Sequence, residues 1–319
     1  MALLEVSHLK KYFQVSGGVL HAVDDVSFTL EQGKTLGVVG ESGCGKSTLG
    51  KTIIRLTEPT GGKVIFDGQD IAEIPAKQFK QVRPKIQMIF QDPYGSLDPR
   101  RSVTQLIAEP MVIYKVTKSK QELSKRVKEL MDTVGIAQRF AMSYPHELDG
   151  GRRQRIGIAR ALALDPSFIV CDEPVSALDV SIQAQILNLL DDLQKQLGLT
   201  YMFITHDLSV VRHISDEICV MYLGQIIEKC EAKELFRNSL HPYTKALLSA
   251  IPVPSVDYRP KKILLKGELS SPIDPPDRCR FAPRCPYADE GCRNCATPQL
   301  QDMGGGHFVA CHKVAAGQL

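Results

Sequence analysis

Short apolar runs, each ending at a polar or glycine-rich turn, recur at wide intervals along the chain. The clearest lie at residues 36–39, 86–90, 168–171 and 201–204. Continuous apolar runs of this length are typical of parallel strands that are buried on both faces. Residues 26–30 and 63–67 alternate more between apolar and polar side chains and are bounded by glycines, which predicts an antiparallel flank. We therefore expect an α/β fold with a mixed central sheet.

The stretch between the second and third apolar runs has the spacing of helices. Its clearest part carries apolar side chains at three- and four-residue steps and then a glycine: Leu123, Val127, Leu130, Met131, Val134 and Gly135. This spacing predicts an amphipathic helix and its end. We expect a helical subdomain, inserted into the sheet at about residues 95–165. A further helix is predicted over residues 181–197, with Gly198 at its end.

Length and charge narrow the possible classes of protein. A chain of 319 residues can bury one large core and carry a smaller appended unit. Its 39 basic and 36 acidic residues give a formal net charge of +3 without a basic arm, so nucleic acid is not an expected partner. No run reaches the roughly 18–20 apolar residues of a membrane-spanning helix. The first residues lack the apolar segment of a secretory signal, so we expect the chain to stay in the cytosol.

The chain changes character after about residue 235. Prolines become frequent, and five of the nine cysteines fall between Cys279 and Cys311. In the cytosol such cysteines are expected to be free thiols or metal ligands, because disulfides are rare there. We therefore expect a domain over residues 1–235 and an irregular, cysteine-rich C-terminal extension over residues 236–319.

A complete G-x-x-x-x-G-K-[ST] loop, which begins at Gly40, follows the first buried run and precedes a helix-compatible segment. Its glycines let backbone N–H groups turn toward phosphates, Lys46 neutralises the β- and γ-phosphate oxygens, and the Ser47 hydroxyl is a ligand for Mg²⁺. The motif predicts that the chain binds ATP and Mg²⁺. The residues expected to contact the nucleotide here are Ser42, Gly43, Cys44, Gly45, Lys46, Ser47 and Thr48.

Polar side chains at the ends of the other buried runs complete the predicted site. Asp172 ends an apolar strand and is expected to hold Mg²⁺ through water, and the adjacent Glu173 can polarise the attacking water. His206 follows another strand and can stabilise the charge that develops on the γ-phosphate. Gln91 lies just past a further strand, so four polar groups are expected at four strand ends. The pattern predicts ATP hydrolysis with Glu173 and His206 as catalytic residues.

These residues, in this order, resemble the ATP-binding cassette (ABC) family over residues 1–235. Gln91 resembles the Q-loop glutamine, which implies contact with Mg²⁺, and His206 resembles the switch histidine. Residues 176–179 resemble the D-loop, which includes Asp179, and Tyr12 resembles the aromatic residue that stacks on adenine. The resemblance implies a P-loop NTPase fold in which two cassettes dimerise head to tail.

Residues 148–155 resemble the family signature, whose usual form is L-S-G-G-Q. Asp149, Gly150 and Gly151 take the positions implied to face the ATP of a partner cassette, but the sequence departs from the usual form at Asp149 and Arg152. Like unit charges about 4 Å apart cost roughly 4 kcal/mol at an effective dielectric of about 20, unless Arg152 or protonation offsets the repulsion. Alternatively, Asp149 serves as a helix N-cap. Because a homodimer would carry the substitution twice, we expect a heterodimer with a second ABC ATPase.

Four cysteines of the extension follow a C-x5-C-x6-C-x18-C spacing: Cys279, Cys285, Cys292 and Cys311. Zinc sites favour C-x2-C pairs, and only Cys292 and Cys295 offer one, so an iron–sulfur cluster suits the spacing better. The alternative is a set of free or partly oxidised thiols on the extension.

The extension also narrows the resemblance within the ABC family. His241-Pro242-Tyr243-Thr244 and residues 279–286 resemble the C-terminal extension of dipeptide and oligopeptide importer ATPases, most closely the second, F-type subunit. This implies a [4Fe-4S] cluster, two membrane permeases, an extracytoplasmic substrate-binding protein and a place on the cytoplasmic face of the membrane. The implied function is ATP hydrolysis that powers import of dipeptides or oligopeptides. The alternatives are a nickel importer ATPase of the same family and a soluble ABC ATPase outside transport.

Overall fold

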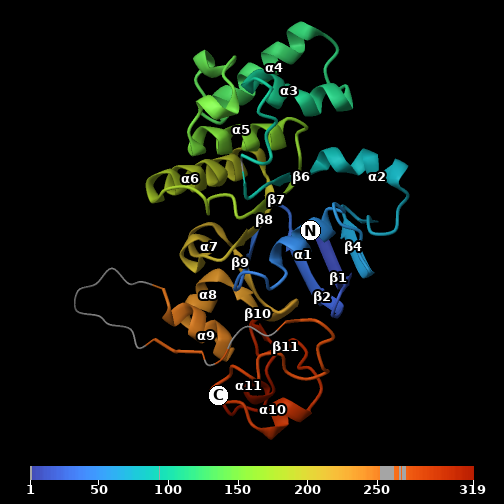
Figure 1. The fold of residues 1–319 in the computed structure, drawn as a ribbon, viewed down its shortest axis with the longest axis vertical. Coiled ribbons are helices and arrows are strands. Elements are labelled where there is room, and N and C mark those ends of the chain that lie inside the picture. Colours follow the sequence, from blue (N-terminus) through green and yellow to red (C-terminus); the bar gives the residue numbers. More distant parts are fainter. Residues whose placement is uncertain (1, 93, 252–261, 266, 268–270) are drawn as a thin grey trace, which may run out of the picture. The chain divides into compact units, whose positions relative to one another are not determined.

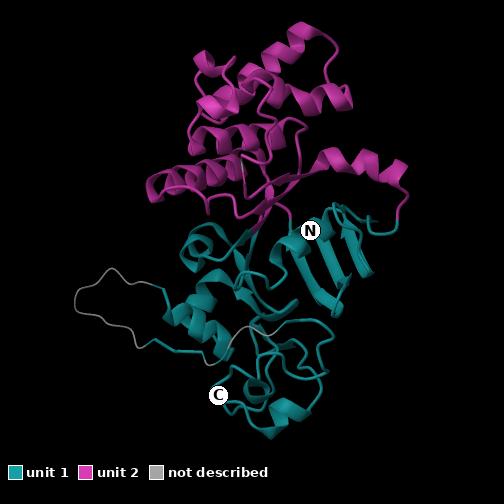
Figure 2. Cartoon of the chain, viewed as in Figure 1, with its two compact units in different colours: residues 1–31, 35–73, 204–319 teal, residues 32–34, 74–203 magenta. Residues whose placement is uncertain are grey.

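The computed structural model describes the chain except residues 1, 93, 252–261, 266 and 268–270 (Figure 1). The chain divides into two compact units (Figure 2). Unit 1 consists of residues 1–31, 35–73 and 204–319, and unit 2 consists of residues 32–34 and 74–203. The domain boundary suggested after residue 235 falls inside unit 1 and stays a prediction. Three prolines of the predicted irregular extension lie outside the described residues: Pro252, Pro254 and Pro260.

An antiparallel sheet in unit 1 has the strand order β2-β1-β4-β5. Its strands are β1 (Ala2–Val15), β2 (Gly18–Glu31), β4 (Gly61–Phe66) and β5 (Gln69–Asp70). Val6 of β1 is buried and lies opposite Phe28 on one side and Val64 on the other. The sheet confirms the antiparallel flank predicted from residues 26–30 and 63–67, and it places β1 between those two strands.

The remaining strands of unit 1 have mixed directions. β3 (Thr35–Val39), in which every residue is buried, runs parallel to β9 (Glu217–Tyr222). β9 pairs antiparallel with β10 (Gln225–Glu231), β10 with β12 (Phe308–Val309), and β12 with β11 (Gln301–Asp302). The C-terminal extension therefore continues the sheet that contains β3.

Helix α9 (Pro242–Ser249) and the aromatic residues around it join the extension to the core of unit 1. His241 is the N-cap, where its Nδ1 accepts a hydrogen bond from the Tyr243 N–H at 3.1 Å, and Pro242 occupies the first helical position. Phe281 is buried, with its ring centroid 5.3 Å from that of Tyr222 and 5.4 Å from that of Tyr243. Burial of a phenylalanine stabilises a fold by about 1.5–3 kcal/mol. The other helices of unit 1 are α1 (Lys46–Ile53), α7 (Leu208–Ile214), α8 (Ala232–Arg237), α10 (Glu290–Asn294) and α11 (His312–Ala315).

Unit 2 contains the other predicted buried strands and the predicted helical region. β6 (Ile86–Ile89) runs parallel to β7 (Phe168–Asp172), and β8 (Thr200–Thr205), whose last two residues belong to unit 1, follows β7 in the sheet order. Helices α3, α4 and α5 fall within the residues predicted to be helical. The helical elements are α2 (Ala76–Val82), η1 (Arg83–Lys85), α3 (Val103–Tyr114), α4 (Lys120–Thr133), η2 (Gln138–Phe140), η3 (Pro145–Glu147), α5 (Gly150–Leu162) and α6 (Val180–Leu197).

Glycines end two of these helices as the sequence predicts. Gly198 caps α6 in the left-handed conformation, with φ of 65°, and Gly135 follows α4 with φ of 70°. A side chain with a Cβ rarely adopts this conformation, so glycine is the favoured residue at such ends.

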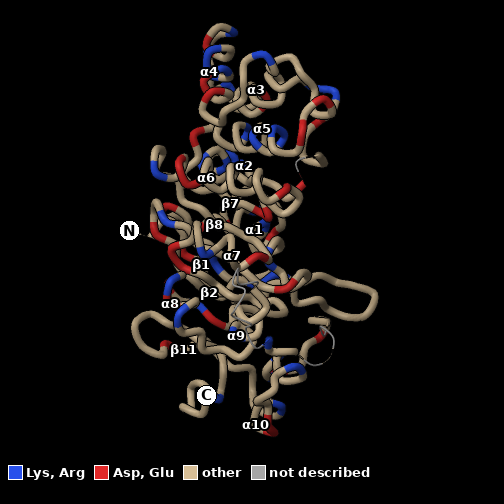
Figure 3. The backbone as a smooth tube through the Cα atoms, turned by 90° about the vertical axis from the view of Figure 1, so that its left-hand side faces the viewer, with Lys and Arg blue, Asp and Glu red and all other residues tan. Residues whose placement is uncertain are grey.

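Charged residues of both signs are interspersed along both units (Figure 3). On α4 and α6, Lys125 and Lys195 each pair with an acidic residue one helical turn away. Such pairs are typical of helix faces in contact with solvent. Among the helices that the structure describes, none has the length and apolar character needed to cross a membrane.

Candidate functional site

The phosphate loop lies between β3 and α1 in unit 1, and its glycines have backbone conformations that other residues rarely adopt. Gly40, Gly43 and Gly45 have φ values of 154°, 79° and 105°. A Cβ at Gly40 would lie 2.3 Å from the Met221 carbonyl oxygen, and one at Gly45 would lie 2.0 Å from the Ala22 carbonyl oxygen. Glycine is therefore required at Gly40 and Gly45 both for conformation and for space.

Lys46 begins α1 and is almost fully buried. Its Nζ donates hydrogen bonds to the carbonyl oxygens of Gly40 and Glu41, at 2.8 and 2.9 Å. These bonds hold the ammonium group at the loop that it is predicted to serve. Cys44 is buried beside it, and burial raises the pKa of the Cys44 thiol, so this side chain is a neutral packing residue. Ser47 and Thr48 are half-buried in the first turn of α1, and Ser42 and Gly43 are exposed.

The end of β7 in unit 2 carries the predicted acidic pair. Asp172 is buried, and Glu173 follows it with φ of 45°, an uncommon conformation for a residue with a side chain. The Gln91 Nε2, just past β6, donates a hydrogen bond to Glu173 Oε2 at 2.9 Å. Two polar residues that the sequence places at separate strand ends thus lie in contact. Backbone strain of this kind is concentrated at functional sites, which supports a role for Glu173.

The signature-like segment confirms the structural interpretation of Asp149. Asp149 is the N-cap of α5, and its Oδ1 accepts a hydrogen bond from the Arg152 N–H at 2.8 Å. The Arg152 guanidinium bonds to the other carboxylate oxygen, so the negative charge has a basic partner in the same turn. Gly150 and Gly151 form the first turn of this helix. Asp179 caps α6 in the same way, accepting from the Ile182 N–H at 3.0 Å.

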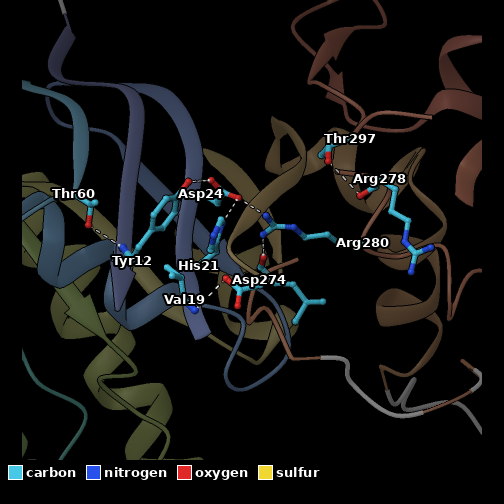
Figure 4. Close-up of polar contacts among 10 residues, drawn as sticks. Tyr12, Val19, His21, Asp24, Thr60, Asp274, Arg278, Arg280 and Thr297 are labelled. Atoms are coloured by element: carbon cyan, nitrogen blue, oxygen red, sulfur yellow. Dashed lines mark hydrogen bonds and ion pairs between the residues drawn. The ribbon is translucent and has the colours of Figure 1, made fainter. Parts of the chain in front are cut away.

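Tyr12 of β1 belongs to a polar group that the sequence did not reveal. Its ring stacks on that of His21, with centroids 4.0 Å apart and planes 20° from parallel. Its hydroxyl donates to Asp24, which also lies beside His21 and Arg280 (Figure 4). Burial raises the pKa of Asp24, but the hydrogen bonds from Tyr12 and His21 and the charge of Arg280 outweigh it, so the pKa lies below its usual value. Asp24 is therefore a charged acceptor.

The predicted site residues are distributed over both units. The phosphate loop, Tyr12 and His206, which is exposed just past β8, belong to unit 1. Gln91, Asp172, Glu173, the signature-like segment and Asp179 belong to unit 2. Their assignment as ATP and Mg²⁺ ligands stays a prediction.

The four cysteines predicted as ligands line one small cavity in the extension. Cys279, Cys285, Cys292 and Cys311 all contribute to its wall, with apolar residues such as Phe281, whereas Cys295 is exposed and is not part of the wall. In the described ranges, no three His, Cys, Asp or Glu side chains are grouped so that they could hold a metal ion. The cavity wall thus includes the four cysteines predicted as ligands and leaves out Cys295.

Comparisons with known proteins match both parts of the chain. Residues 23–176 match the ABC transporter family, and residues 227–292 match the family described as oligopeptide/dipeptide transporter, C-terminal region. The chain is 53% identical to the putative oligopeptide transport ATP-binding protein YkfD of Bacillus subtilis, over 98% of this chain and 95% of the relative. It is 51% identical to the oligopeptide transport ATP-binding proteins AppF of B. subtilis (97% of both chains) and OppF of Salmonella typhimurium (98% and 96%).

Solved structures confirm the predicted fold class. The dimeric post-hydrolysis state of the ATP-binding cassette MJ0796, bound to ADP and Pi, has a TM-score of 0.66 and 29% identity, over 72% of this chain and 98% of that chain. The α/β cassette with its mixed and antiparallel sheets is therefore the expected P-loop architecture. From these matches, the chain belongs to the ABC transporter family of ATP-binding proteins, within the group of oligopeptide transport ATP-binding proteins.

Proposed function

We propose that this chain is the ATP-hydrolysing subunit of an importer of dipeptides or oligopeptides. The observation that carries the proposal is that one chain joins a complete phosphate loop to the oligopeptide/dipeptide transporter C-terminal region. Relatives that match it over nearly their full length are named as oligopeptide transport ATP-binding proteins. ATP hydrolysis is the activity of the ABC family to which the chain belongs.

In this proposal, Lys46 exchanges its two carbonyl contacts in the loop for the β- and γ-phosphate oxygens of ATP. Ser47, Asp172 and Gln91 would hold Mg²⁺, which would neutralise phosphate charge. Glu173 accepts the proton of the attacking water, and His206 stabilises the charge that develops on the γ-phosphate.

The bond between Gln91 and Glu173 gives the proposed mechanism a resting state. While Gln91 donates to Glu173, the carboxylate is held by an amide instead of by the attacking water. A Gln91 side chain that turns toward Mg²⁺ would release that bond. Glu173 would then exchange its Gln91 contact for the attacking water once nucleotide and metal are in place, which would limit wasteful hydrolysis.

The partners follow from the same proposal. Two cassettes would act on the cytoplasmic face of two permeases, which receive the peptide from an extracytoplasmic binding protein. We propose a heterodimer with a second ABC ATPase, because Asp149 departs from the usual signature serine. The Arg152 partner of Asp149 offsets part of the carboxylate's charge, so the covered ATP site is expected to be weakened and not abolished.

We also propose that the extension holds a [4Fe-4S] cluster through Cys279, Cys285, Cys292 and Cys311. The cavity that these four thiols share supports the proposal, because a four-iron cluster takes one thiolate per iron and spreads its ligands more widely than a single metal ion does. When bound, the cluster would cross-link an extension whose described residues form only short helices and strands. Anaerobically purified protein should show a broad visible charge-transfer band and contain iron, whereas colourless protein that carries zinc would overturn this assignment.

The proposed function is tested by purifying the chain anaerobically from its native membranes and identifying the proteins that accompany it by mass spectrometry. Two permeases, a second cassette and a peptide-binding protein are the expected companions. A nickel-binding protein in place of the peptide-binding protein would indicate that the imported substrate is nickel and not a peptide. Recovery alone, or with ribosomes or chromatin, would contradict a role in transport. Peptide uptake by vesicles with the purified complex, with Glu173→Gln as the inactive control, then measures the activity directly.

A further inference from the structure

Two arginines of the extension, four residues apart, reach residues of the proposed ATP site within unit 1. The guanidinium of Arg280 bonds to the carboxylate of Asp24 and to the Leu223 carbonyl oxygen. The guanidinium of Arg284 makes two bonds to the carboxylate of Glu41, at 2.6 and 3.0 Å. Both arginine side chains are at most 10% exposed, so neither is a solvated surface charge.

Asp24 connects Arg280 to the ring of Tyr12. One Asp24 oxygen accepts a hydrogen bond from the Tyr12 hydroxyl, and the other lies 3.1 Å from His21 Nδ1 and also bonds to Arg280 (Figure 4). Tyr12 and His21 therefore form one stacked pair with a common anchor. Without Arg280, Asp24 would lose its basic partner from the extension, and the Tyr12–His21 pair would lose the contact that fixes the orientation of its anchor.

The extension also pairs with the strand that carries His21. The Asp274 N–H donates to the Val19 carbonyl oxygen at 2.9 Å, and the His21 N–H donates to the Pro272 carbonyl oxygen at 2.9 Å. A side chain at Gly18 would collide with Asp274, since a Cβ there would lie 1.8 Å from its carboxylate oxygen. The start of β2 is thus shaped to receive this part of the extension.

Glu41 connects Arg284 to the phosphate loop. Glu41 is the second residue of the motif; its N–H donates to the Tyr243 hydroxyl at 2.9 Å, and its carbonyl oxygen accepts from Lys46 Nζ at 2.9 Å. A carboxylate in a loop that binds a triphosphate would repel the ligand. The two bonds from Arg284 neutralise that carboxylate, whose side chain is still 29% exposed.

We propose that residues 279–285 of the extension are part of the ATP site, in which Arg280 positions the Tyr12–His21 pair against the base and Arg284 neutralises Glu41 beneath the phosphates. Both are positioning residues, because each acts through another side chain. The inference rests on the proposed function, since it takes Tyr12 and the phosphate loop as the binding surfaces for ATP. It makes the extension a determinant of nucleotide affinity.

The test compares Arg280→Met and Arg284→Met with Arg278→Met, in the full-length chain. Each variant removes one positive charge from the same segment, and the exposed Arg278 side chain points away from the Asp24 network (Figure 4). Binding of Mg·ATP and of Mg·tripolyphosphate, which has no base, is measured by titration calorimetry. Loss of one charge-assisted contact is expected to weaken binding by about tenfold. Arg280→Met should lose that factor for ATP alone, Arg284→Met should lose it for both ligands, and Arg278→Met should lose it for neither.

A rescue variant separates neutralisation from a merely structural role. Glu41→Gln combined with Arg284→Met removes both charges, and it should bind both ligands within about threefold of the unaltered chain if repulsion is the cause. If Arg280→Met does not fold, Arg280→Lys keeps a positive charge but lacks the planar fork of donors with which Arg280 bonds to Asp24 and to the Leu223 carbonyl, and a smaller loss confined to ATP is expected. Equal losses for both ligands in the Arg280 variants, or no rescue by Glu41→Gln, would overturn the inference. Absence of ATP binding by the unaltered chain and by Arg278→Met would instead refute the proposed function.

Discussion

Replacement of Glu228 by glutamine or by alanine should lower the stability of unit 1, and the loss should be larger for alanine. Glu228 lies on β10 with its side chain fully buried. Its Oε1 accepts a hydrogen bond from the Leu240 N–H at 2.7 Å and lies 2.8 Å from His307 Nε2, and its Oε2 accepts from the His241 N–H at 3.0 Å. The carboxylate therefore joins β10 to the start of α9 and to the last part of the extension.

The magnitudes follow from the number of donors left without an acceptor. Glu228→Gln keeps one oxygen, which can retain the Leu240 and His307 contacts, but its amide nitrogen then faces the His241 N–H. One unsatisfied buried donor costs about 1–3 kcal/mol, so we expect a loss of about 2 kcal/mol. Glu228→Ala leaves all three donors unpaired, and we expect a loss of about 4 kcal/mol. Glu231→Gln, an exposed change on the same strand, should cost less than about 0.5 kcal/mol.

Equilibrium urea unfolding followed by circular dichroism measures these losses, and the pH dependence identifies the cause. Burial raises the pKa of Glu228, but hydrogen bonds from His307 and from the Leu240 and His241 N–H groups outweigh it, so the pKa lies below its ordinary value of 4.5. A depressed carboxyl pKa gives stability that is present above the unfolded-state pKa and is lost as the pH falls through the folded-state pKa. The difference between the unaltered chain and Glu228→Gln should therefore shrink below about pH 4.5. A loss under about 0.5 kcal/mol at neutral pH, or a difference independent of pH, would refute the reasoning.

Three further predictions concern the candidate sites. Glu173→Gln should keep ATP binding but lower phosphate release by at least about a hundredfold, because the amide cannot accept a proton; unchanged turnover would exclude Glu173 as the base. Asp149→Ala should lose the N-cap of α5 and about 1 kcal/mol of stability, while Asp149→Ser keeps a capping oxygen and should lose less than half of that; equal urea midpoints for the two would argue against the cap. Cys285→Ser should abolish the visible absorbance of anaerobically purified protein and Cys295→Ser should not, since Cys285 lines the cavity and Cys295 does not; the reverse result would reassign the ligands.

The features that the sequence predicted best are those that depend on residues close together in the chain. β3 and β7 are buried on both faces, so they appear as continuous apolar runs that need no knowledge of their partners. The phosphate loop is recognisable because its glycines meet local demands of conformation and space at Gly40 and Gly45. Asp149 could be predicted as an N-cap because its acceptor role involves only the next turn of the helix.

Contacts between distant residues could not be predicted in the same way. Arg280 and Asp24 are 256 residues apart, and Arg284 and Glu41 are 243 residues apart. In the sequence each is an ordinary charged residue, and its immediate neighbours do not show which residue of opposite charge it will meet. Glu228 is similar, because its N–H donors come from Leu240 and His241 at the start of α9, and the sequence of β10 does not show whether its carboxylate meets water or those donors. The motif that begins at His241 identified the extension. It did not predict that the Tyr243 hydroxyl accepts a hydrogen bond from the phosphate loop.

These distant contacts lead to a last prediction about the boundary suggested after residue 235. Three acidic residues before it, Asp24, Glu41 and Glu228, are bonded to Arg280, Arg284 and His307 of the extension. A chain that ends at residue 235 would leave these carboxylates without their partners and would uncover the ring of Tyr222. Each broken buried pair costs up to about 3–5 kcal/mol, against a total stability of about 5–15 kcal/mol for a typical domain.

We therefore expect residues 1–235 alone to be aggregated or unfolded in unit 1, as measured by circular dichroism and size-exclusion chromatography beside the full chain. The same truncated chain with Asp24→Asn, Glu41→Gln and Glu228→Gln separates the two causes. Recovery of soluble, folded protein would assign the defect to unpaired charge, and continued aggregation would assign it to the lost apolar cover over Tyr222. A truncated chain with the urea midpoint of the full protein would instead make residue 235 a true domain boundary, and the extension would be an appended module that the rest of unit 1 does not need.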